Sequence, residues 1–265
     1  MQIGKQRLEL ASPQIDLWLC APPQLAAGDS LRAYVELLND DERERYRRLK
    51  FPQHQREYLA SHALLRTALS CYADMDPVAW RFTRNEYGKP AIENPLAEPL
   101  QFNLSHTSGL TLCAIGRGAE IGADVEFHSN SQALLEVADH YFSEREVADL
   151  RGLPVDEQGD AFFRYWTLKE SYIKAKGEGL SIPLDSFSFY FDERQRIHCE
   201  AAPGVSLDGA WSFASFQLSP CYTAAVAVHS ERVEFRLFWS TLDRHEQLSD
   251  VGQIAEYLEQ PRPVL

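Results

Sequence analysis

A single stripe of apolar residues at helical spacing dominates the second half of the chain. The stripe predicts a helix over about residues 156–176. Its members are Phe162, Phe163, Trp166 and Ile173. Gly177 and Gly179 follow the last apolar position, where glycines typically end a helix.

Charged residues share the face of this helix that carries Trp166. Glu170 lies one turn after Trp166, and Lys174 lies one turn after Glu170. Exposed glutamates are common on helices, so Glu170 alone carries little information. A carboxylate and an ammonium behind a tryptophan on a largely apolar helix nevertheless indicate the edge of a site.

A second informative pattern is the alternation from Glu120 to Phe127, which predicts a strand. Asp124 and Glu126 are two residues apart, so both carboxylates project from the same face. A strand with one solvated acidic face is the ordinary alternative. Together with Glu170, however, the pair provides three carboxylates. Three carboxylates suit a hard divalent cation if phosphates of the substrate complete its coordination shell.

The two halves of the chain follow one plan. In each half a helix-start pattern precedes a long helix, then an alternating strand, then a hairpin. The first half offers Asp41–Glu44, about Gln53–Tyr72, Val78–Phe82 and Thr111–Ile115. The second half offers Ser143–Glu146, about Asp156–Lys176, Phe187–Phe191 and Thr223–Val228.

This order predicts an α+β fold of two similar subdomains, related by a pseudo-twofold axis, with the active site at their interface. The expected division is an N-terminal subdomain at 1–117, a C-terminal subdomain with the metal site at 118–232, and a C-terminal extension at 233–265. The extension should contain a strand near Val233–Trp239 and a short helix near Ser249–Glu259.

Composition excludes several classes of protein. The 265 residues carry a formal net charge of −13, which argues against a general nucleic-acid-binding surface. No apolar run approaches the ~20 residues that a membrane helix requires. The five cysteines show no metal-type spacing and are odd in number, which indicates a reducing compartment. We therefore expect a cytoplasmic protein that binds neither nucleic acid nor membrane.

Three further segments could contact phosphate, although each also has an ordinary explanation. Phe102–Gly109 looks like a strand running into a polar turn that carries Ser105 and His106, or simply a β-turn with a capping histidine. Glu86–Pro90 looks like a tight loop with Lys89 at its tip, or a plain hairpin turn. Arg43–Lys50 is locally basic, which is usually a solvated helix face.

In their order along the chain these motifs resemble the 4′-phosphopantetheinyl transferases, specifically the larger, pseudo-dimeric Sfp type. The resemblance covers roughly residues 10–230 and rests most firmly on the helix motif. The residues that carry it are Gly88-Lys89-Pro90, Asn103-Leu104-Ser105-His106, Gly122-x-Asp124-x-Glu126 and Trp166-x-x-Lys169-Glu170-x-x-x-Lys174-x-x-Gly177-x-Gly179-Leu180.

The resemblance implies transfer of the phosphopantetheine arm of coenzyme A (CoA) to a serine of an apo acyl, peptidyl or aryl carrier protein, with release of 3′,5′-ADP. It implies that Asp124, Glu126 and Glu170 hold Mg²⁺, and that Glu170 also takes the serine proton. The catalytic set is then Glu170, Lys174 and His106, with Lys174 stabilising the diphosphate.

The resemblance also implies the CoA contacts: Ser105 and His106 at the phosphates, and Lys89 and Pro90 at the adenine and 3′-phosphate end. Arg45 stands where family members often place a cation, whereas Glu42 stands at another such position, so the cation that holds the 3′-phosphate stays open. We expect a monomer. A CoA- or carrier-binding module without transfer activity, or a scaffold, remains the alternative.

Overall fold

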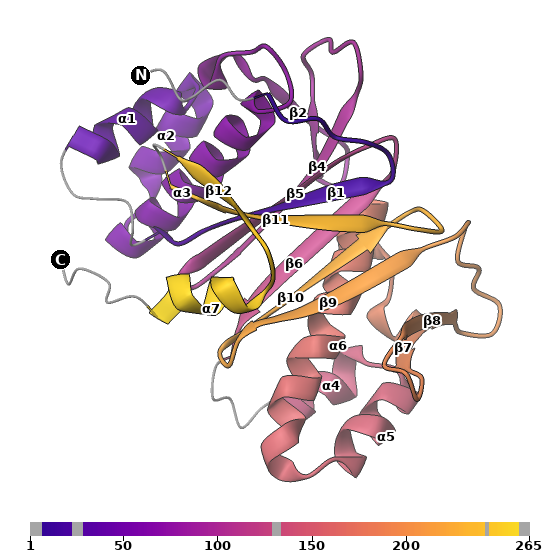
Figure 1. Cartoon of the computed structure of the whole chain (residues 1–265). Coiled ribbons are helices and arrows are strands. Elements are labelled where there is room, and N and C mark those ends of the chain that lie inside the picture. The colour runs from indigo at the N-terminus through magenta and orange to yellow at the C-terminus, as the bar shows by residue number, and fades with distance from the viewer. Residues whose placement is uncertain (1–6, 23–28, 129–133, 242–243, 260–265) are drawn as a thin grey trace.

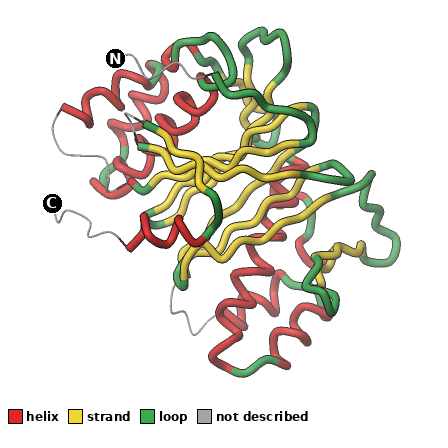
Figure 2. Tube along the Cα trace, in the orientation of Figure 1, coloured by secondary structure: helices red, strands yellow, loops and turns green. Residues whose placement is uncertain are grey.

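A computed structural model describes residues 7–22, 29–128, 134–241 and 244–259, and it confirms a mixed α+β fold (Figure 2). The helices are α1 Asp29–Leu37, α2 Asp40–Arg48, α3 Pro52–Ser70, α4 Leu134–Tyr141, α5 Glu144–Gly152, α6 Val155–Lys176 and α7 Gly252–Glu259. Short 3₁₀ turns lie at Pro77–Ala79, Gly179–Ser181 and Leu184–Ser186. No helix among the described residues combines the length and the apolar character needed to cross a bilayer.

Most strands belong to two sheets. The five-stranded sheet has the order β12-β11-β1-β5-β4, formed by His245–Leu248, Glu234–Ser240, Gln14–Cys20, Leu110–Arg117 and Leu100–Thr107. The three-stranded sheet has the order β6-β10-β9, formed by Ile121–Phe127, Tyr222–Val228 and Ser212–Ser219. Two small hairpins complete the set: β2 Phe82–Arg84 with β3 Pro90–Ile92, and β7 Phe187–Phe191 with β8 Ile197–Ala201.

Helices α1 to α6 lie on the outer sides of these sheets, whereas Ile254 and Leu258 of α7 belong to the core between the sheets (Figure 1). One hydrophobic core lies between the two sheets and joins Leu17 and Leu112 of the larger to Val125 and Val226 of the smaller. A second core packs α3 against the larger sheet, and a third packs α4, α5 and α6 against the smaller. Burial of alternate strand residues on both faces explains the long apolar runs of β5 and β10.

The C-terminal segment adds to the larger sheet. β11 pairs in parallel with β1 on one side and antiparallel with β12 on the other, so it lies inside the sheet and not at its edge. The Arg236 guanidinium donates to both carboxylate oxygens of the fully buried Asp16, at 2.8 and 2.6 Å. The segment that the sequence sets apart as an extension, 233–265, thus contributes two strands of the larger sheet, β11 and β12.

The two long helices, the paired hairpins and β6 are confirmed near their expected bounds. The expected strand at Val78–Phe82 is wrong for most of its length. Pro77–Ala79 forms a 3₁₀ turn, because Pro77 favours the first helical position and the Asp76 carboxylate accepts the Val78 N–H at 3.1 Å. Only Phe82 belongs to a strand, β2.

One of the two predicted helix starts is displaced. Ser143 and Glu146 form a capping box at α5, as expected. At α2 the cap is Asn39 rather than Asp41, and its partner is Glu42. Asn39 lies two residues after the end of α1 and is itself a strong N-cap residue, so α2 begins two residues earlier than expected.

Gly122 explains how α6 comes to lie directly on β6. A Cβ atom built on Gly122 would stand 1.9 Å from the Ser171 carbonyl oxygen and 2.3 Å from the Ala175 nitrogen. These are backbone atoms of α6, so no side-chain rotation could relieve the overlap. The glycine of the Gly122-x-Asp124-x-Glu126 motif is therefore a packing requirement that brings the acidic face of β6 against α6.

Gly122→Ala is accordingly expected to lower the free energy of unfolding by more than about 3 kcal/mol, beyond ordinary overpacking. The measurement is urea unfolding followed by circular dichroism. Gly159→Ala is the matched control, because Gly159 lies inside α6 with open space around it, and alanine there should be neutral or stabilising. Equal stability of the two variants would show that α6 can move away from β6 at little cost.

Candidate active site

The face of α6 that carries Trp166, Glu170 and Lys174 meets the acidic face of β6. The Lys174 ammonium lies 2.5 Å from Asp124 Oδ1, and it donates to the Ser105 hydroxyl at 3.0 Å. Trp166 hydrogen-bonds the Glu126 carboxylate. Lys174 thus pairs with Asp124 on the strand, and no ion pair joins it to Glu170 within the described part of the chain.

Two carboxyl groups in this contact, those of Glu126 and Glu170, have raised pKa values. Burial and the neighbouring Asp124 raise the pKa of Glu126 to about 7, while Lys174 and the bond from Trp166 partly oppose that rise. The same two causes, burial and Asp124, raise the pKa of Glu170. Carboxyl groups whose pKa values are raised by burial and by a neighbouring carboxylate favour either a proton or a nearby cation.

The surroundings of Asp124 fit a divalent metal in part. In the described residues no group of three or more acidic, histidine or cysteine side chains is already gathered as a ligand shell. However, Asp124 Oδ2 is buried without a hydrogen-bond partner, although Asp124 Oδ1 has two. An orphaned carboxylate oxygen, beside two carboxylates that a positive charge would favour in ionised form, suits an oxygen-binding ion such as Mg²⁺.

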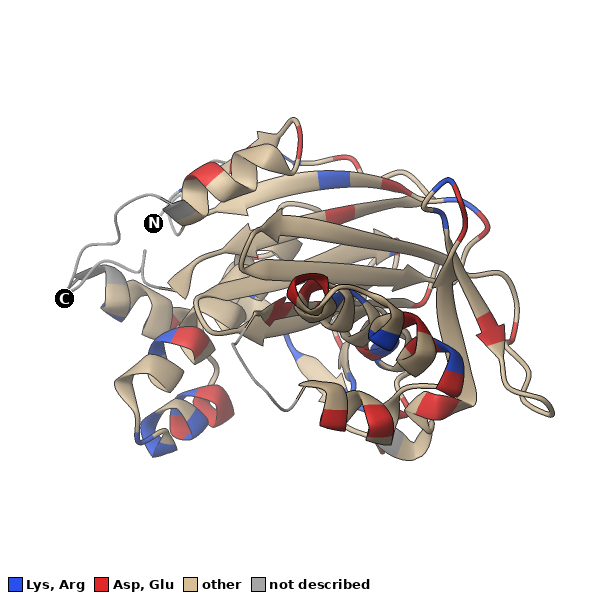
Figure 3. Ribbon diagram, turned by 90° about the horizontal axis from the view of Figure 1, so that it is seen from below, with Lys and Arg blue, Asp and Glu red and all other residues tan. Residues whose placement is uncertain are grey.

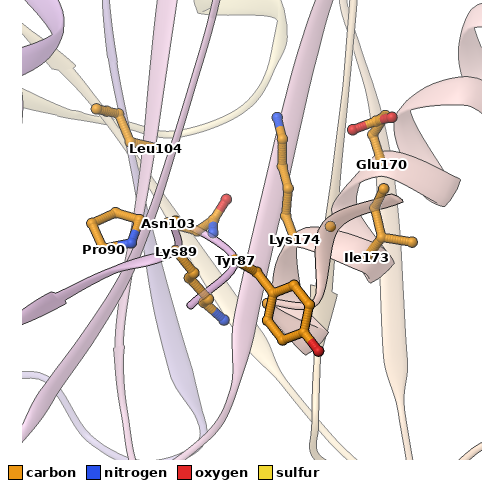
Figure 4. Close-up of a pocket in the computed structure, with 11 residues that line it drawn as sticks. Tyr87, Lys89, Pro90, Asn103, Leu104, Glu170, Ile173 and Lys174 are labelled. Atoms are coloured by element: carbon orange, nitrogen blue, oxygen red, sulfur yellow. The ribbon is translucent and has the colours of Figure 1, made fainter. Parts of the chain in front are cut away.

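A pocket of about 370 Å³ opens beside this contact (Figure 4). Figure 4 shows residues of the β2–β3 hairpin on one side and residues of α6 on the other. Its lining consists of Tyr87, Gly88, Lys89, Pro90, Asn103, Leu104, Glu170, Ile173, Lys174, Gly177 and Gly179. The pocket therefore combines an acid and a cation with an apolar wall, the usual make-up of a site for a small molecule.

The β2–β3 hairpin is pinned to the end of α6. The Lys89 ammonium donates to the Ala175 carbonyl at 2.5 Å, and the Asn85 side-chain amide donates to the Gly177 carbonyl at 2.8 Å. Cations near the last carbonyls of a helix are stabilising, so Lys89 works partly as a helix cap. Burial lowers the pKa of Lys89. Its ammonium points to α6, and it is not a free charge at the loop tip.

The expected polar turn at Phe102–Gly109 is a strand for most of its length. β4 continues to Thr107, and only Ser108 and Gly109 form the turn. Side chains therefore alternate: Ser105 is buried against β6, while His106 points away and is exposed. His106 is not among the residues that line the pocket.

Arg45 also lies outside the pocket lining, exposed on α2. Arg45 is nevertheless close enough to Tyr58 to lower the pKa of its hydroxyl. That hydroxyl is buried without a hydrogen-bond partner. Burial and Glu42 raise the pKa of Tyr58 to about 12, and Arg45 and Arg84 oppose that rise. Arg84 donates to the carbonyl of Gly88 at the pocket, so basic groups extend from the pocket rim toward α2.

Glu42 has a structural explanation. Its carboxylate accepts from the Asn39 backbone N–H at 2.9 Å, from the Arg66 guanidinium at 2.8 Å and contacts His62 Nδ1 at 3.0 Å. Although burial opposes it, these partners lower the pKa of Glu42 to about 2. Glu42 is thus a helix cap and ion-pair residue, which accounts for an acid at a position where a cation could have stood.

The residues expected from sequence fall into two groups. The structure brings together Asp124, Glu126, Glu170, Lys174 and Ser105, and places Lys89 and Pro90 in the adjoining pocket. His106 and Arg45 lie apart. Sequence reasoning gave no role to Tyr87, Asn103 and Ile173, which line the pocket. Asn103 carried a signal, since an amide inside an otherwise apolar strand needs a partner.

Charges of both signs are spread over the helices and loops, and the strands carry few (Figure 3).

Comparison with known proteins gives a consistent result. Residues 120–228 match the family model of the 4′-phosphopantetheinyl transferase superfamily, and residues 26–116 match a model described as 4′-phosphopantetheinyl transferase, N-terminal. The chain is 34% identical over 222 residues to 4′-phosphopantetheinyl transferase HetI of Nostoc sp., covering 83% of this chain and 90% of the relative. It is 33% identical over 202 residues to 4′-phosphopantetheinyl transferase Sfp of Bacillus subtilis, covering 75% and 85%.

Among solved structures, a holo-(acyl-carrier-protein) synthase from Bacillus anthracis in complex with CoA (3′,5′-ADP) matches with 19% identity and a TM-score of 0.37, covering 41% of this chain and 93% of that one. Membership of a family follows from the two relatives HetI and Sfp and from the two family models, and not from this solved structure. A pocket lined by Glu170 and Lys174, with the Asp124 carboxylate bonded to Lys174 beside it, is typical of enzymes that handle phosphate groups. Within that class, this chain belongs to the 4′-phosphopantetheinyl transferase superfamily.

Proposed function

We propose that this transferase moves the 4′-phosphopantetheine arm of CoA to a serine hydroxyl of an apo carrier protein and releases 3′,5′-ADP. The observation that carries the proposal is the contact of Asp124 with Lys174 beside Glu170, at the end of a pocket large enough for part of a nucleotide. The family membership supports the same activity. The reaction forms one P–O bond to the serine oxygen and breaks the P–O bond to the leaving 3′,5′-ADP.

The proposed ligands of Mg²⁺ are Asp124, Glu126 and Glu170. Two observations support this assignment: Asp124 Oδ2 is buried without a hydrogen-bond partner, and the pKa values of Glu126 and Glu170 are raised. When bound, the ion neutralises negative charge that builds on the diphosphate during phosphoryl transfer. Lys174 stabilises the same charge as a fixed ammonium. It is already held by Asp124 and Ser105 and needs little reorganisation.

Glu170 is the proposed acceptor of the serine proton. Burial and Asp124 raise its pKa, and a carboxylate with a raised pKa is a stronger base than an ordinary exposed one. Glu170 also lines the pocket, so it can reach a hydroxyl that enters there. The proton leaves the serine oxygen as the new P–O bond forms.

Lys89 and Pro90 are proposed to contact the adenine and 3′-phosphate end of CoA, because both line the pocket opposite α6. Arg45 is proposed for the 3′-phosphate, supported by its place with Arg84 around Tyr58. His106 is proposed to contact CoA phosphate, which requires the coenzyme to extend over the exposed face of β4. Ser105 stands apart from this group because it is buried behind Lys174.

The chain is further proposed to consist of two α+β halves, 1–117 and 118–232, related by a pseudo-twofold axis, with the extension 233–265. Supporting this, each half has a capping-box helix, a long helix and a terminal hairpin: α2, α3 and β4–β5 against α5, α6 and β9–β10. A cytoplasmic monomer is also proposed as the working form.

The transfer is tested by mixing the protein with CoA, MgCl₂ and several apo carrier proteins and measuring carrier mass. A mass gain of one phosphopantetheine per carrier is expected, and none with EDTA in place of MgCl₂. Asp124→Asn should lower turnover at least about a hundredfold, since it removes a charged ligand while keeping an acceptor for Lys174. CoA binding without any mass gain would make the chain a binding module; near-normal turnover of folded Asp124→Asn would refute the metal assignment.

A further inference from the structure

Strands β4 and β6 are joined through side chains and not through a backbone ladder. β4 is an edge strand of the larger sheet, and β6 is an edge strand of the smaller. Three alternate residues of β4 accept backbone N–H groups of β6 instead. The bonds are Ala123 N to Asn103 Oδ1 at 3.0 Å, Val125 N to Ser105 Oγ at 3.3 Å, and Phe127 N to Thr107 Oγ1 at 3.1 Å.

This side-chain ladder (Asn103, Ser105 and Thr107) also reaches the carboxylates of β6. The Ser105 hydroxyl donates to Asp124 Oδ1 at 2.8 Å, and the Thr107 hydroxyl lies 3.5 Å from Glu126 Oε2. Each hydroxyl thus connects a backbone N–H of β6 with the carboxylate one residue earlier. The ladder fixes both the position of the strand and the orientation of its two acidic side chains.

The hydrogen-bonding capacity of Ser105 is fully used inside the protein. A serine hydroxyl has one proton to donate and two lone pairs to accept with. The proton goes to Asp124, and the lone pairs take the Val125 N–H and the Lys174 ammonium. The side chain is also buried. A phosphate oxygen could bond Ser105 only by displacing Asp124, whose charge would then lose a partner.

We infer that Ser105 and Thr107 are positioning residues that orient the Asp124 and Glu126 carboxylates, and that Ser105 is not a contact of the coenzyme. Both bonds to Asp124 end on Oδ1, so Ser105 and Lys174 together leave Oδ2 for a ligand. This changes the role that the sequence resemblance implies for Ser105. The inference rests on the proposed function for its activity readout only.

The decisive comparison is Ser105→Ala against the wild type, with two separate measurements. Isothermal titration calorimetry with CoA in the absence of metal should give a dissociation constant within about threefold of the wild type, because no coenzyme contact is lost. The Mg²⁺ concentration for half-maximal turnover should rise and kcat should fall, each by about tenfold to a hundredfold, as for other residues that orient metal ligands. Ser108→Ala, on the exposed turn of the same hairpin, is the matched control.

Thr107 gives a test that does not depend on how Ser105→Ala folds. Thr107→Val keeps the shape and removes the hydroxyl, whereas Thr107→Ser keeps the hydroxyl. We expect Thr107→Val to raise the Mg²⁺ concentration for half-maximal turnover. Thr107→Ser should keep that concentration close to the wild-type value. Equal behaviour of the two variants would overturn the role of Thr107.

A tenfold loss of CoA affinity in Ser105→Ala at unchanged kcat would overturn the role of Ser105. The calorimetric arm separates this inference from the proposed function, since it needs no carrier. If the wild type modified no carrier, the transfer proposal would fail. The inference would then be judged on calorimetric titration of CoA-bound protein with Mg²⁺: weaker Mg²⁺ binding in Ser105→Ala supports it, and unchanged binding refutes it.

Discussion

Lys174→Met is expected to lower kcat/KM on an apo carrier by about a hundredfold to a thousandfold at saturating Mg²⁺. Removing one preorganised group that stabilises transition-state charge typically has an effect of this size. Lys174 meets the requirements, because it lines the pocket and is held in place by Asp124 and Ser105 before any substrate arrives. A loss below fivefold in folded protein would return Lys174 to the class of ordinary helix residues.

Two variants separate chemistry from folding at this position. Asp124 is buried, so Lys174→Met also leaves a carboxylate without its counter-charge and should lower the melting temperature. Lys174→Arg keeps the charge and should recover much of that stability, yet little activity, because a planar guanidinium does not replace a compact ammonium. Lys176→Met is the control on the same helix, since Lys176 pairs only loosely with Asp208 at 3.6 Å, away from the pocket.

A large effect on stability is also expected from Glu146→Gln, a loss of about 3–5 kcal/mol in the free energy of unfolding. Glu146 and Lys169 form an ion pair at 2.8 Å, and both side chains are completely buried. Lys169 also donates to the carbonyls of Leu184 and Phe187, at 2.6 and 2.7 Å. The amide of glutamine would leave the buried ammonium without a counter-charge.

Urea unfolding of Glu146→Gln beside Glu144→Gln measures this effect. Glu144 lies on the same helix, α5, but is exposed, so its variant should differ from the wild type by less than about 0.5 kcal/mol. A double variant, Glu146→Gln with Lys169→Met, should be more stable than Glu146→Gln alone, because it removes the unpaired charge. A Glu146→Gln protein as stable as the control would mean that water reaches Lys169.

Lys169 illustrates a limit of motif reading. It lies next to Glu170 in the helix motif, yet its ammonium faces the core between α5 and β7 rather than the pocket. Adjacent residues on a helix point about 100° apart, so a motif can carry one residue for catalysis and its neighbour for packing. The identity of the partner, Glu146, depends on where α5 packs, and no spacing along the chain indicates it.

The sequence by itself determined the local elements and the chemical types at the site. Helix and strand periodicity, capping residues and terminal glycines act over a few residues, so α6, β6 and the two terminal hairpins were predictable near their bounds. The shared face of Trp166, Glu170 and Lys174 followed from helix geometry alone. The acidic pair Asp124 and Glu126 followed from the two-residue period of a strand.

Only the tertiary structure decided which of these groups meet. Lys174 pairs with Asp124 and not with its helical neighbour Glu170, because Gly122 lets α6 approach β6 closely. Ser105 joins them, since the edge strands β4 and β6 are bound through side chains. His106 points away because β4 continues as a strand through Thr107, so the side chains of Ser105 and His106 lie on opposite faces. Such contacts depend on packing between distant segments, whereas sequence periodicity reports only which face of its own element a residue occupies.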